Sequence, residues 1–96
     1  GMQRDRRLTV PDHVVFEVLD GEAVLLNLRA GTYFGLNPVA TRAWELIREL
    51  GTLGEVGDAM SREYDVDREL LDDDLCRLLT DLEEKGLLVT EAEEPR

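Results

Sequence analysis

The spacing of the apolar residues changes once along the chain, at Asn37-Pro38. Before this point, apolar residues stand in short runs that alternate with polar residues and end at glycine, which is typical of β-strands. After it, they recur every three or four positions, which is typical of amphipathic helices. The sequence therefore predicts an α+β fold in which a small sheet is followed by helices.

Two segments before this point predict a β-hairpin. Residues 13–19 and 22–28 flank Asp20-Gly21, a pair typical of the two-residue type I′ turn, in which both turn residues have positive φ. This turn fixes the register of the two strands. It places Phe16 opposite Leu25, Val18 opposite Ala23 and Val15 opposite Leu26.

A short third strand is predicted over residues 32–36, after a three-residue loop, Arg29-Ala30-Gly31, with a bulge at the glycine. Alternation gives the sheet two apolar faces: Val14, Phe16, Val18 and Leu25 form one, and Val15, Val24, Leu26, Phe34 and Leu36 form the other. One face is expected to pack on the helices. The second must be covered by the N-terminal arm or by a partner, because an uncovered apolar face of that size is unusual for a monomer.

The remaining chain predicts three helices. The first begins at Asn37-Pro38, a capping residue followed by a proline whose missing N–H costs nothing there, and ends at Gly51. Trp44 lies on its apolar stripe and is expected in the core. Thr52-Leu53-Gly54-Glu55 is a capping box that begins the second helix, which its two glycines should make the least stable of the three.

The third helix begins at the capping residue Asp67, where Val66 is placed to pack against Leu71, and ends at Lys85-Gly86. Its predicted core stripe is Leu71, Leu75, Leu78 and Leu82. Residues 87–89 predict a short terminal strand.

These elements form one domain, residues 13–90, in a chain of 96 residues. Residues 1–12 are expected to be a mobile arm in which only Leu8 and Val10 can pack, and Gly1 ahead of Met2 is typical of a cloning scar. Residues 91–96 are an acidic tail. A three-stranded antiparallel sheet that leads into three helices is winged-helix-like.

Charge argues against the DNA binding that a winged helix often performs. The formal net charge is −11, with 22 acidic residues against 11 Lys and Arg. Most of the excess lies in residues 55–96, which hold 15 acidic and 5 basic residues, a net charge of −10. A surface of that sign repels the phosphate backbone. No apolar run long enough to span a membrane is present, and a single cysteine suits a reducing compartment, so a cytoplasmic protein is expected.

The sequence predicts no catalytic or metal site, and no cofactor. Cys76 is placed within a helix close to Asp72-Asp73-Asp74, surroundings that disfavour a reactive thiolate. Consecutive helical residues point about 100° apart, so these three carboxylates cannot converge on one ion. His13 has no second histidine with which to bind a metal. A non-catalytic role is therefore expected.

The third strand offers a different function, because the backbone groups of an edge strand can pair with an extended peptide. The third helix can supply side chains beside that strand. Its core stripe has two flanks: Leu70, Asp74, Arg77 and Asp81 form one, and Asp72, Cys76, Leu79 and Glu83 form the other. The sequence leaves open which of them faces the strand.

Several segments resemble the PqqD-like family (coenzyme PQQ synthesis protein D). The resemblance lies in residues 22–28, in Gly31-Thr32-Tyr33-Phe34-Gly35-Leu36-Asn37 with Ala40 and Trp44, and in the later Glu63-Tyr64-Asp65-Val66 and leucine-rich third helix. It implies a non-catalytic peptide-binding domain, a precursor peptide recognition element. In that family the leader of a ribosomally made precursor lies as an added strand against the third strand and beside the third helix, for presentation to a modifying enzyme such as a radical SAM protein.

Carried onto this sequence, the resemblance implies a docking edge formed by Thr32, Tyr33, Phe34, Gly35 and Leu36, with Asp74 and Leu78 on the groove wall. Helical spacing adds Leu75, Arg77 and Asp81. The pathway stays open, since such domains serve PQQ biosynthesis, lasso peptides and other peptide-derived natural products. Two rival hypotheses are a winged-helix DNA-binding regulator and a structural dimerisation module; a homodimer is also compatible with peptide binding.

Overall fold

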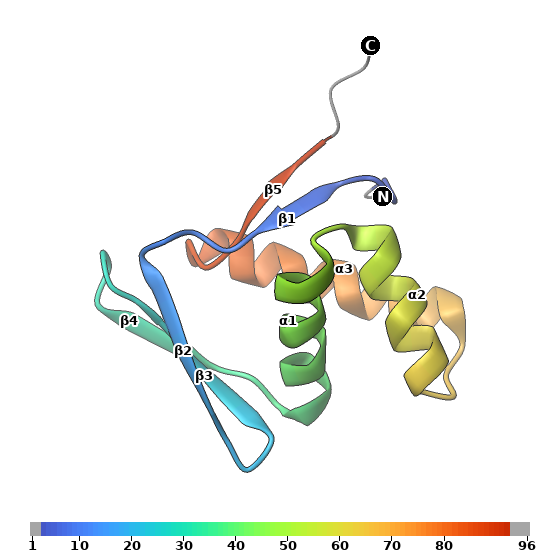
Figure 1. The fold of residues 1–96 in the computed structure, drawn as a ribbon, viewed down its shortest axis with the longest axis horizontal. Coiled ribbons are helices and arrows are strands. Elements are labelled where there is room, and N and C mark those ends of the chain that lie inside the picture. Colours follow the sequence, from blue (N-terminus) through green and yellow to red (C-terminus); the bar gives the residue numbers. More distant parts are fainter. Residues whose placement is uncertain (1–2, 93–96) are drawn as a thin grey trace.

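The computed structural model describes residues 3–92 (Figure 1). A strand of the N-terminal arm pairs with the terminal strand in a small two-stranded ribbon; the sequence predicted the terminal strand but not its partner. A three-stranded antiparallel sheet of order β2-β3-β4 is followed by three helices, so the predicted α+β fold is confirmed. In chain order the elements are β1 (Arg7–Thr9), β2 (Val14–Leu19), β3 (Glu22–Asn27), β4 (Thr32–Gly35), α1 (Pro38–Leu50), α2 (Leu53–Glu63), α3 (Arg68–Glu84) and β5 (Val89–Glu91).

The β2–β3 hairpin has the predicted turn and register. Asp20 and Gly21 have φ values of 54° and 77°, the two positive values that a type I′ turn needs. Phe16 lies opposite Leu25, Val18 opposite Ala23 and Val15 opposite Leu26, all as expected.

The loop between β3 and β4 is longer than predicted. Asn27 lies opposite Thr32, so the loop has four residues, 28–31, rather than three. The Asn27 carboxamide oxygen accepts hydrogen bonds from the N–H groups of Arg29 and Ala30, at 3.0 and 3.1 Å. Because this side chain closes the turn, pairing stops one residue earlier than the hydrophobic pattern suggested.

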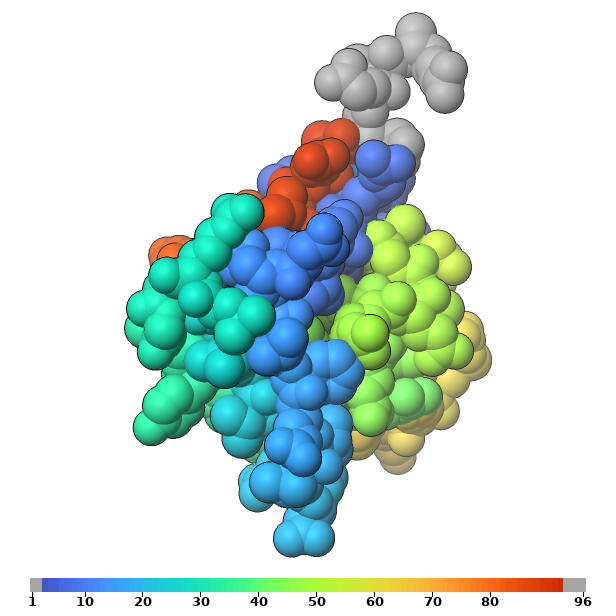
Figure 2. Space-filling model, turned by 60° about the vertical axis from the view of Figure 1, so that its left-hand side comes forward, coloured from blue at the N-terminus to red at the C-terminus, as the bar shows by residue number. Residues whose placement is uncertain are grey.

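The predicted faces of the sheet were wrong for the third strand. Phe34 lies directly opposite Leu25, so it and Leu36 share the inner face with Leu25 rather than the outer face. The four-residue loop accounts for this, because a change of one residue in loop length moves every following side chain to the other face. The outer face keeps Val15, Val24 and Tyr33, which are 45%, 42% and 77% exposed. Figure 2 turns this side of the sheet toward the reader.

The predicted helix ends are confirmed. Asn37 caps α1 by accepting from the Ala40 N–H at 2.8 Å, and Gly51 ends that helix in the left-handed conformation. The Thr52 hydroxyl accepts from the Glu55 N–H and donates to the Glu55 carboxylate, which begins α2. Asp67 caps α3, and Gly86, at φ 70°, follows the helix. The predicted partner of Leu71, Val66, is 49% exposed.

The core stripe of α3 differs from the prediction at one position. Leu79 is fully buried, whereas Leu78 is only partly buried. Both leucines fit a helical stripe that starts at Leu71 and Leu75, so periodicity alone could not choose between them. The packing of α3 turns Leu79 into the core and leaves Leu78 at its edge.

The part of the N-terminal arm that the structure describes is paired with other elements and is not the mobile segment expected from its composition. β1 pairs with β5 through Leu8 opposite Thr90, and Leu8 is 5% exposed. The carbonyl of Arg4 accepts from the Gly54 N–H at 2.8 Å, which ties the arm to α2. The arm therefore lies beside the helices and leaves the outer face of the sheet uncovered (Figures 1 and 2).

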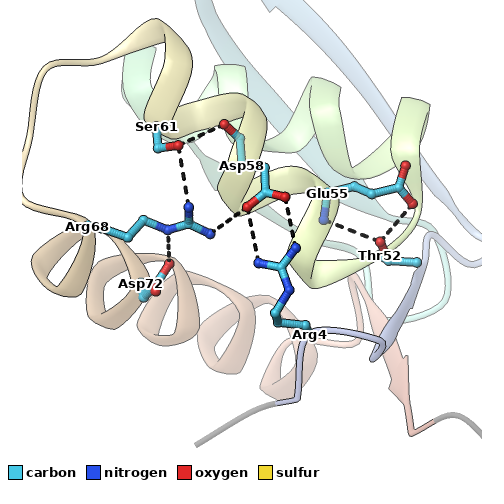
Figure 3. Close-up of polar contacts among 7 residues, drawn as sticks. All are labelled: Arg4, Thr52, Glu55, Asp58, Ser61, Arg68 and Asp72. Carbon is cyan, nitrogen blue, oxygen red and sulfur yellow. Dashed lines mark hydrogen bonds and ion pairs between the residues drawn. The ribbon is translucent and has the colours of Figure 1, made fainter.

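A cluster of four charged side chains fixes this arm (Figure 3). The Arg4 guanidinium donates to both carboxylate oxygens of Asp58, at 3.1 and 2.8 Å. Arg68 donates to Asp58 and to Asp72, both at 2.9 Å. The arm, α2 and α3 are thus connected through one carboxylate.

The terminal strand lies two residues later than predicted, over Val89–Glu91. Leu87 and Leu88 precede it and are 2% exposed, so they belong to the core. Of the predicted acidic tail, residues 93–96 lie outside the described residues, as do Gly1 and Met2, where the sequence suggested a cloning scar. Across residues 3–92 no helix is long and apolar enough to cross a membrane.

Trp44 is at the centre of the core, as predicted. Its side chain is 0% exposed, and its ring meets the Phe16 ring edge to face, with centroids 5.8 Å apart. Because Phe16 belongs to β2, this contact joins α1 to the inner face of the sheet.

Replacing Trp44 by alanine should lower the free energy of unfolding by about 3–5 kcal/mol, because it leaves a large cavity between α1 and the sheet. Trp44→Phe keeps most of the volume and should cost less. Chemical denaturation followed by circular dichroism measures both changes. An unchanged midpoint in Trp44→Ala would show that this side chain is not part of the core.

The ion-pair cluster should make stability depend on pH in the acid range. Hydrogen bonds from Arg4 and then Arg68 hold the pKa of Asp58 well below its ordinary value of 3.8. The stabilisation is fully present above about pH 4 and falls at lower pH, because the unfolded chain then takes up a proton that the folded chain does not. Asp58→Asn removes this stabilisation. The difference in Tm between the unmodified protein and the Asp58→Asn variant should therefore shrink below about pH 4.

The control for this experiment is Asp73→Asn, since Asp73 forms no ion pair with any residue of the described chain. Its Tm should follow that of the unmodified protein at each pH. If Asp58→Asn also followed it, the cluster would not contribute to stability.

Candidate functional site

The strand β4 lies at one edge of the sheet, paired only with β3 within residues 3–92. The Leu36 N–H donates to the Ala23 carbonyl at 2.8 Å, which sets the alternation of the ladder. Thr32 and Phe34 therefore turn their backbone groups toward β3, and Tyr33 and Gly35 turn theirs to the open edge. The edge thus presents two N–H groups and two carbonyls.

The side chains of the predicted edge have different environments. Tyr33 is exposed on the outer face, whereas Phe34 is partly buried on the inner face, with the Lys85 ammonium 4.9 Å from its ring centroid. Leu36 is 4% exposed and uses its N–H within the sheet, so it contributes a buried side chain rather than a free backbone donor. A Cβ added at Gly35 would meet no atom within 4 Å, which leaves that point of the edge open.

A groove of about 460 Å³ lies between α1 and α3 and reaches Asn37, which follows β4; no residue of β4 itself lines it. The first turns of α1 form one wall, and α3 forms the other. All five α3 residues predicted for the site line it: Asp74, Leu75, Arg77, Leu78 and Asp81. The structure therefore brings the helical half of the predicted site together in one concave surface.

The two flanks of α3 lie in different surroundings, which answers the question that the sequence left open. Asp72 and Cys76 line a separate hollow of about 140 Å³ with Arg4 and Arg68. Glu83 accepts a hydrogen bond from the Thr90 hydroxyl at 3.0 Å, next to β5. Only the flank that carries Asp74 and Asp81 faces the groove; Leu70, counted with it, is 57% exposed and does not line it.

The charges of the groove wall are unevenly paired. Arg77 donates to Asp74 at 3.2 Å, and both side chains are largely exposed. Asp81 is partly buried in the groove and forms no ion pair with a residue of the described chain. The wall is thus left with one carboxylate that no cation of residues 3–92 neutralises.

Sequence reasoning missed part of the groove. Val39, Ala40 and Ala43 line it from α1, and Lys85 stands one turn beyond Asp81 on the same flank of α3. The spacing of Asp74, Leu78, Asp81 and Lys85 is a helical stripe, so the sequence did contain a signal for the lysine. The contribution of α1 could not be read from the sequence, because it depends on how α1 packs beside α3.

A larger hollow, about 610 Å³, lies at the opposite edge of the sheet, between β2, the arm and α1. The ladder turns the backbone groups of Val14, Phe16 and Val18 to this edge. The Val14 N–H already donates to the Pro11 carbonyl at 3.1 Å, and the Arg48 guanidinium lies 4.5 Å from the Phe16 ring centroid. The arm and α1 thus occupy part of this edge.

The described residues, 3–92, offer little for catalysis. Within residues 3–92 no three His, Cys, Asp or Glu side chains come together to hold a metal ion. The His13 ring shares a hydrogen bond with the Gly86 carbonyl at 3.1 Å, and Cys76 lies partly buried on the other flank of α3. What the groove and edge can do chemically is bind an extended chain by backbone hydrogen bonds and side-chain contacts.

An open edge strand beside a helix-lined groove is the arrangement of domains that bind peptides by strand addition. The chain belongs to the family of coenzyme PQQ synthesis protein D (PqqD), whose profile matches residues 22–88. The resemblance found in the sequence is therefore confirmed.

Two solved structures share the fold. TbiB1 in complex with the TbiA(beta) leader peptide is 43% identical, with a TM-score of 0.81 over 88% of this chain and 98% of TbiB1. A lasso peptide synthetase B1 complexed with the leader peptide is 25% identical, with a TM-score of 0.77 over 86% of this chain and 98% of the other. Comparison with curated protein sequences gives no match.

Proposed function

We propose that this protein binds the leader of a ribosomally made precursor peptide as an added strand on β4 and presents the precursor to a modifying enzyme. The observation that supports this most directly is the open edge at Tyr33 and Gly35, next to the groove on α3. Two relatives of the same fold are solved with leader peptides. The protein itself carries out no chemistry in this proposal.

The geometry divides the binding energy between backbone and side chains. Two outward residues offer at most four backbone hydrogen bonds, each with a net contribution of about 0.5–1.5 kcal/mol. Ordering the peptide consumes much of that gain. Apolar contact with Leu75, Leu78 and Ala40 must therefore supply much of the affinity, for which we expect a Kd near micromolar, about −8 kcal/mol.

The partner enzyme and the pathway are also proposals. A modifying enzyme such as a radical SAM protein would act on the core of the precursor while the leader stays on β4, in PQQ or lasso-peptide biosynthesis or in a related pathway. The acidic α3, with seven acidic and two basic residues, argues against DNA binding through this helix. The exposed outer face of the sheet favours a second role in self-association, which would leave the β4 edge free.

Binding by strand addition predicts which amides respond to a leader. On titration with the TbiA(beta) leader, which a 43% identical relative binds, the backbone amides of residues 32–36 should shift in NMR spectra. Tyr33→Pro removes an outward N–H and should weaken binding about tenfold or more, without the loss of a β2–β3–β4 hydrogen bond. The leader of a precursor encoded beside the gene is the second probe.

Tyr33→Ala is the matched control, because it keeps the N–H and removes only a side chain on the outer face. Its affinity should stay within about twofold of the unmodified protein. If the shifts were confined to residues outside β4 and the groove, or if Tyr33→Pro bound normally, strand addition on β4 would be ruled out.

The two flanks of α3 should differ in what they contribute. Asp74→Ala should leave the fold intact, because its pair with Arg77 is exposed, and should weaken leader binding by about 1–3 kcal/mol. Asp72→Ala should bind normally but unfold more readily, because Asp72 receives a hydrogen bond from Arg68 in the arm cluster. Calorimetry and thermal denaturation separate the two effects. Equal small losses of affinity would mean that Asp74 is only a solvated surface charge.

A further inference from the structure

Two side chains of opposite charge follow each other at the end of α3, one on the groove wall and one just beyond it, over the Phe34 ring. Asp81 lines the groove without an ion-pair partner in residues 3–92, and Lys85 stands one helical turn further along. The Lys85 ammonium lies 4.9 Å from the Phe34 ring centroid, which holds it on the β4 side of α3. The negative and the positive charge therefore follow each other along the path of a peptide strand.

The direction of a strand bound along that path follows from the directions of β4 and α3. Phe34 lies beside Lys85, and the chain after Gly35 passes through Asn37 into α1, where the groove is shared with Asp74. β4 and α3 therefore run in opposite directions. A strand added antiparallel to β4, the more stable pairing, runs in the same direction as α3 and passes Asp81 before Lys85.

The spacing of the two charges matches the repeat of a strand. Four residues of helix rise about 6 Å, and side chains on one face of a strand are about 6.6 Å apart. Residues i and i+2 of a bound strand can therefore stand opposite Asp81 and Lys85 together.

The geometry points to a leader that carries a basic side chain followed, two residues later, by an acidic one, the pair docking on Asp81 and Lys85. This inference rests on the proposed function and adds to it a sequence pattern and a direction. The apolar part of the groove, at Leu75 and Leu78, can hold the side chains of a peptide that runs in either direction. The charge pair therefore adds to the preference for one direction that antiparallel pairing with β4 already gives.

The test uses two peptides of equal composition, built on the TbiA(beta) leader. Their substituted positions are the one with NOEs to the Asp81 side chain and the one two residues further on, beside Lys85. One peptide carries Lys-x-Glu there, and the other carries Glu-x-Lys. Calorimetry should show Lys-x-Glu binding about fivefold tighter, equivalent to about 1 kcal/mol for ion pairs at a partly exposed site.

The double variant Asp81→Lys/Lys85→Glu should invert this preference, and its denaturation midpoint shows whether it is folded. The double variant leaves the net charge unchanged. The control Asp73→Lys does alter the net charge, at a position that does not line the groove, and it should keep the preference for Lys-x-Glu. Equal affinities of both peptides for the unmodified protein would overturn the inference and leave the proposed function standing. No binding of either peptide, with no shift of the β4 amides, would overturn both.

Discussion

The groove depends on the attachment of the end of α3 to the sheet. The buried Asn27 carboxamide donates to the Lys85 carbonyl at 3.0 Å and accepts from two N–H groups of its own loop. A Cβ on Gly86 would stand 2.9 Å from the same amide nitrogen, so only a glycine lets α3 end this close to β3. Since β4 is the next strand, this contact sets how near α3 comes to the open edge.

A second attachment fixes the other end of the groove. The Thr41 hydroxyl accepts from the Ala23 N–H at 2.8 Å and donates to the Leu36 carbonyl at 3.3 Å. This buried side chain joins the first turn of α1 to β3 and to the segment that leaves β4. Both ends of the groove are thus tied to the sheet by hydrogen bonds of buried polar side chains. A preformed groove of this kind spares a peptide part of the cost of ordering its partner.

The acidic surface and the groove have separate physical roles. Four of the ten acidic residues of α2 and α3 pair with arginine, among them Asp58, which joins the arm to the helices. A net charge of −11 keeps anionic partners such as nucleic acid away. The groove, by contrast, combines apolar side chains of α1 and α3 with a few charged ones, of which Asp81 has no ion-pair partner within residues 3–92.

Local chemistry determined much of this structure from the sequence alone. The Asp20-Gly21 turn, the caps at Asn37, Thr52 and Asp67 and the hairpin register all depend on residues within a few positions of one another, and each was predictable. The family pattern and helical spacing likewise gathered the five α3 residues that line one groove.

The tertiary structure decided between alternatives that fit the sequence periodicity equally well. The choice of Leu79 over Leu78 for the core, and of the Asp74 flank over the Asp72 flank for the groove, depends on a small rotation of α3 that both stripes permit. Whether Phe34 lies on the inner or the outer face of the sheet depended on one residue in the length of the β3–β4 loop. The Asn27 side chain sets that length. The arm was misjudged because its partners, Asp58 and β5, lie more than fifty residues away in the chain, and polar composition carries no sign of such distant pairing.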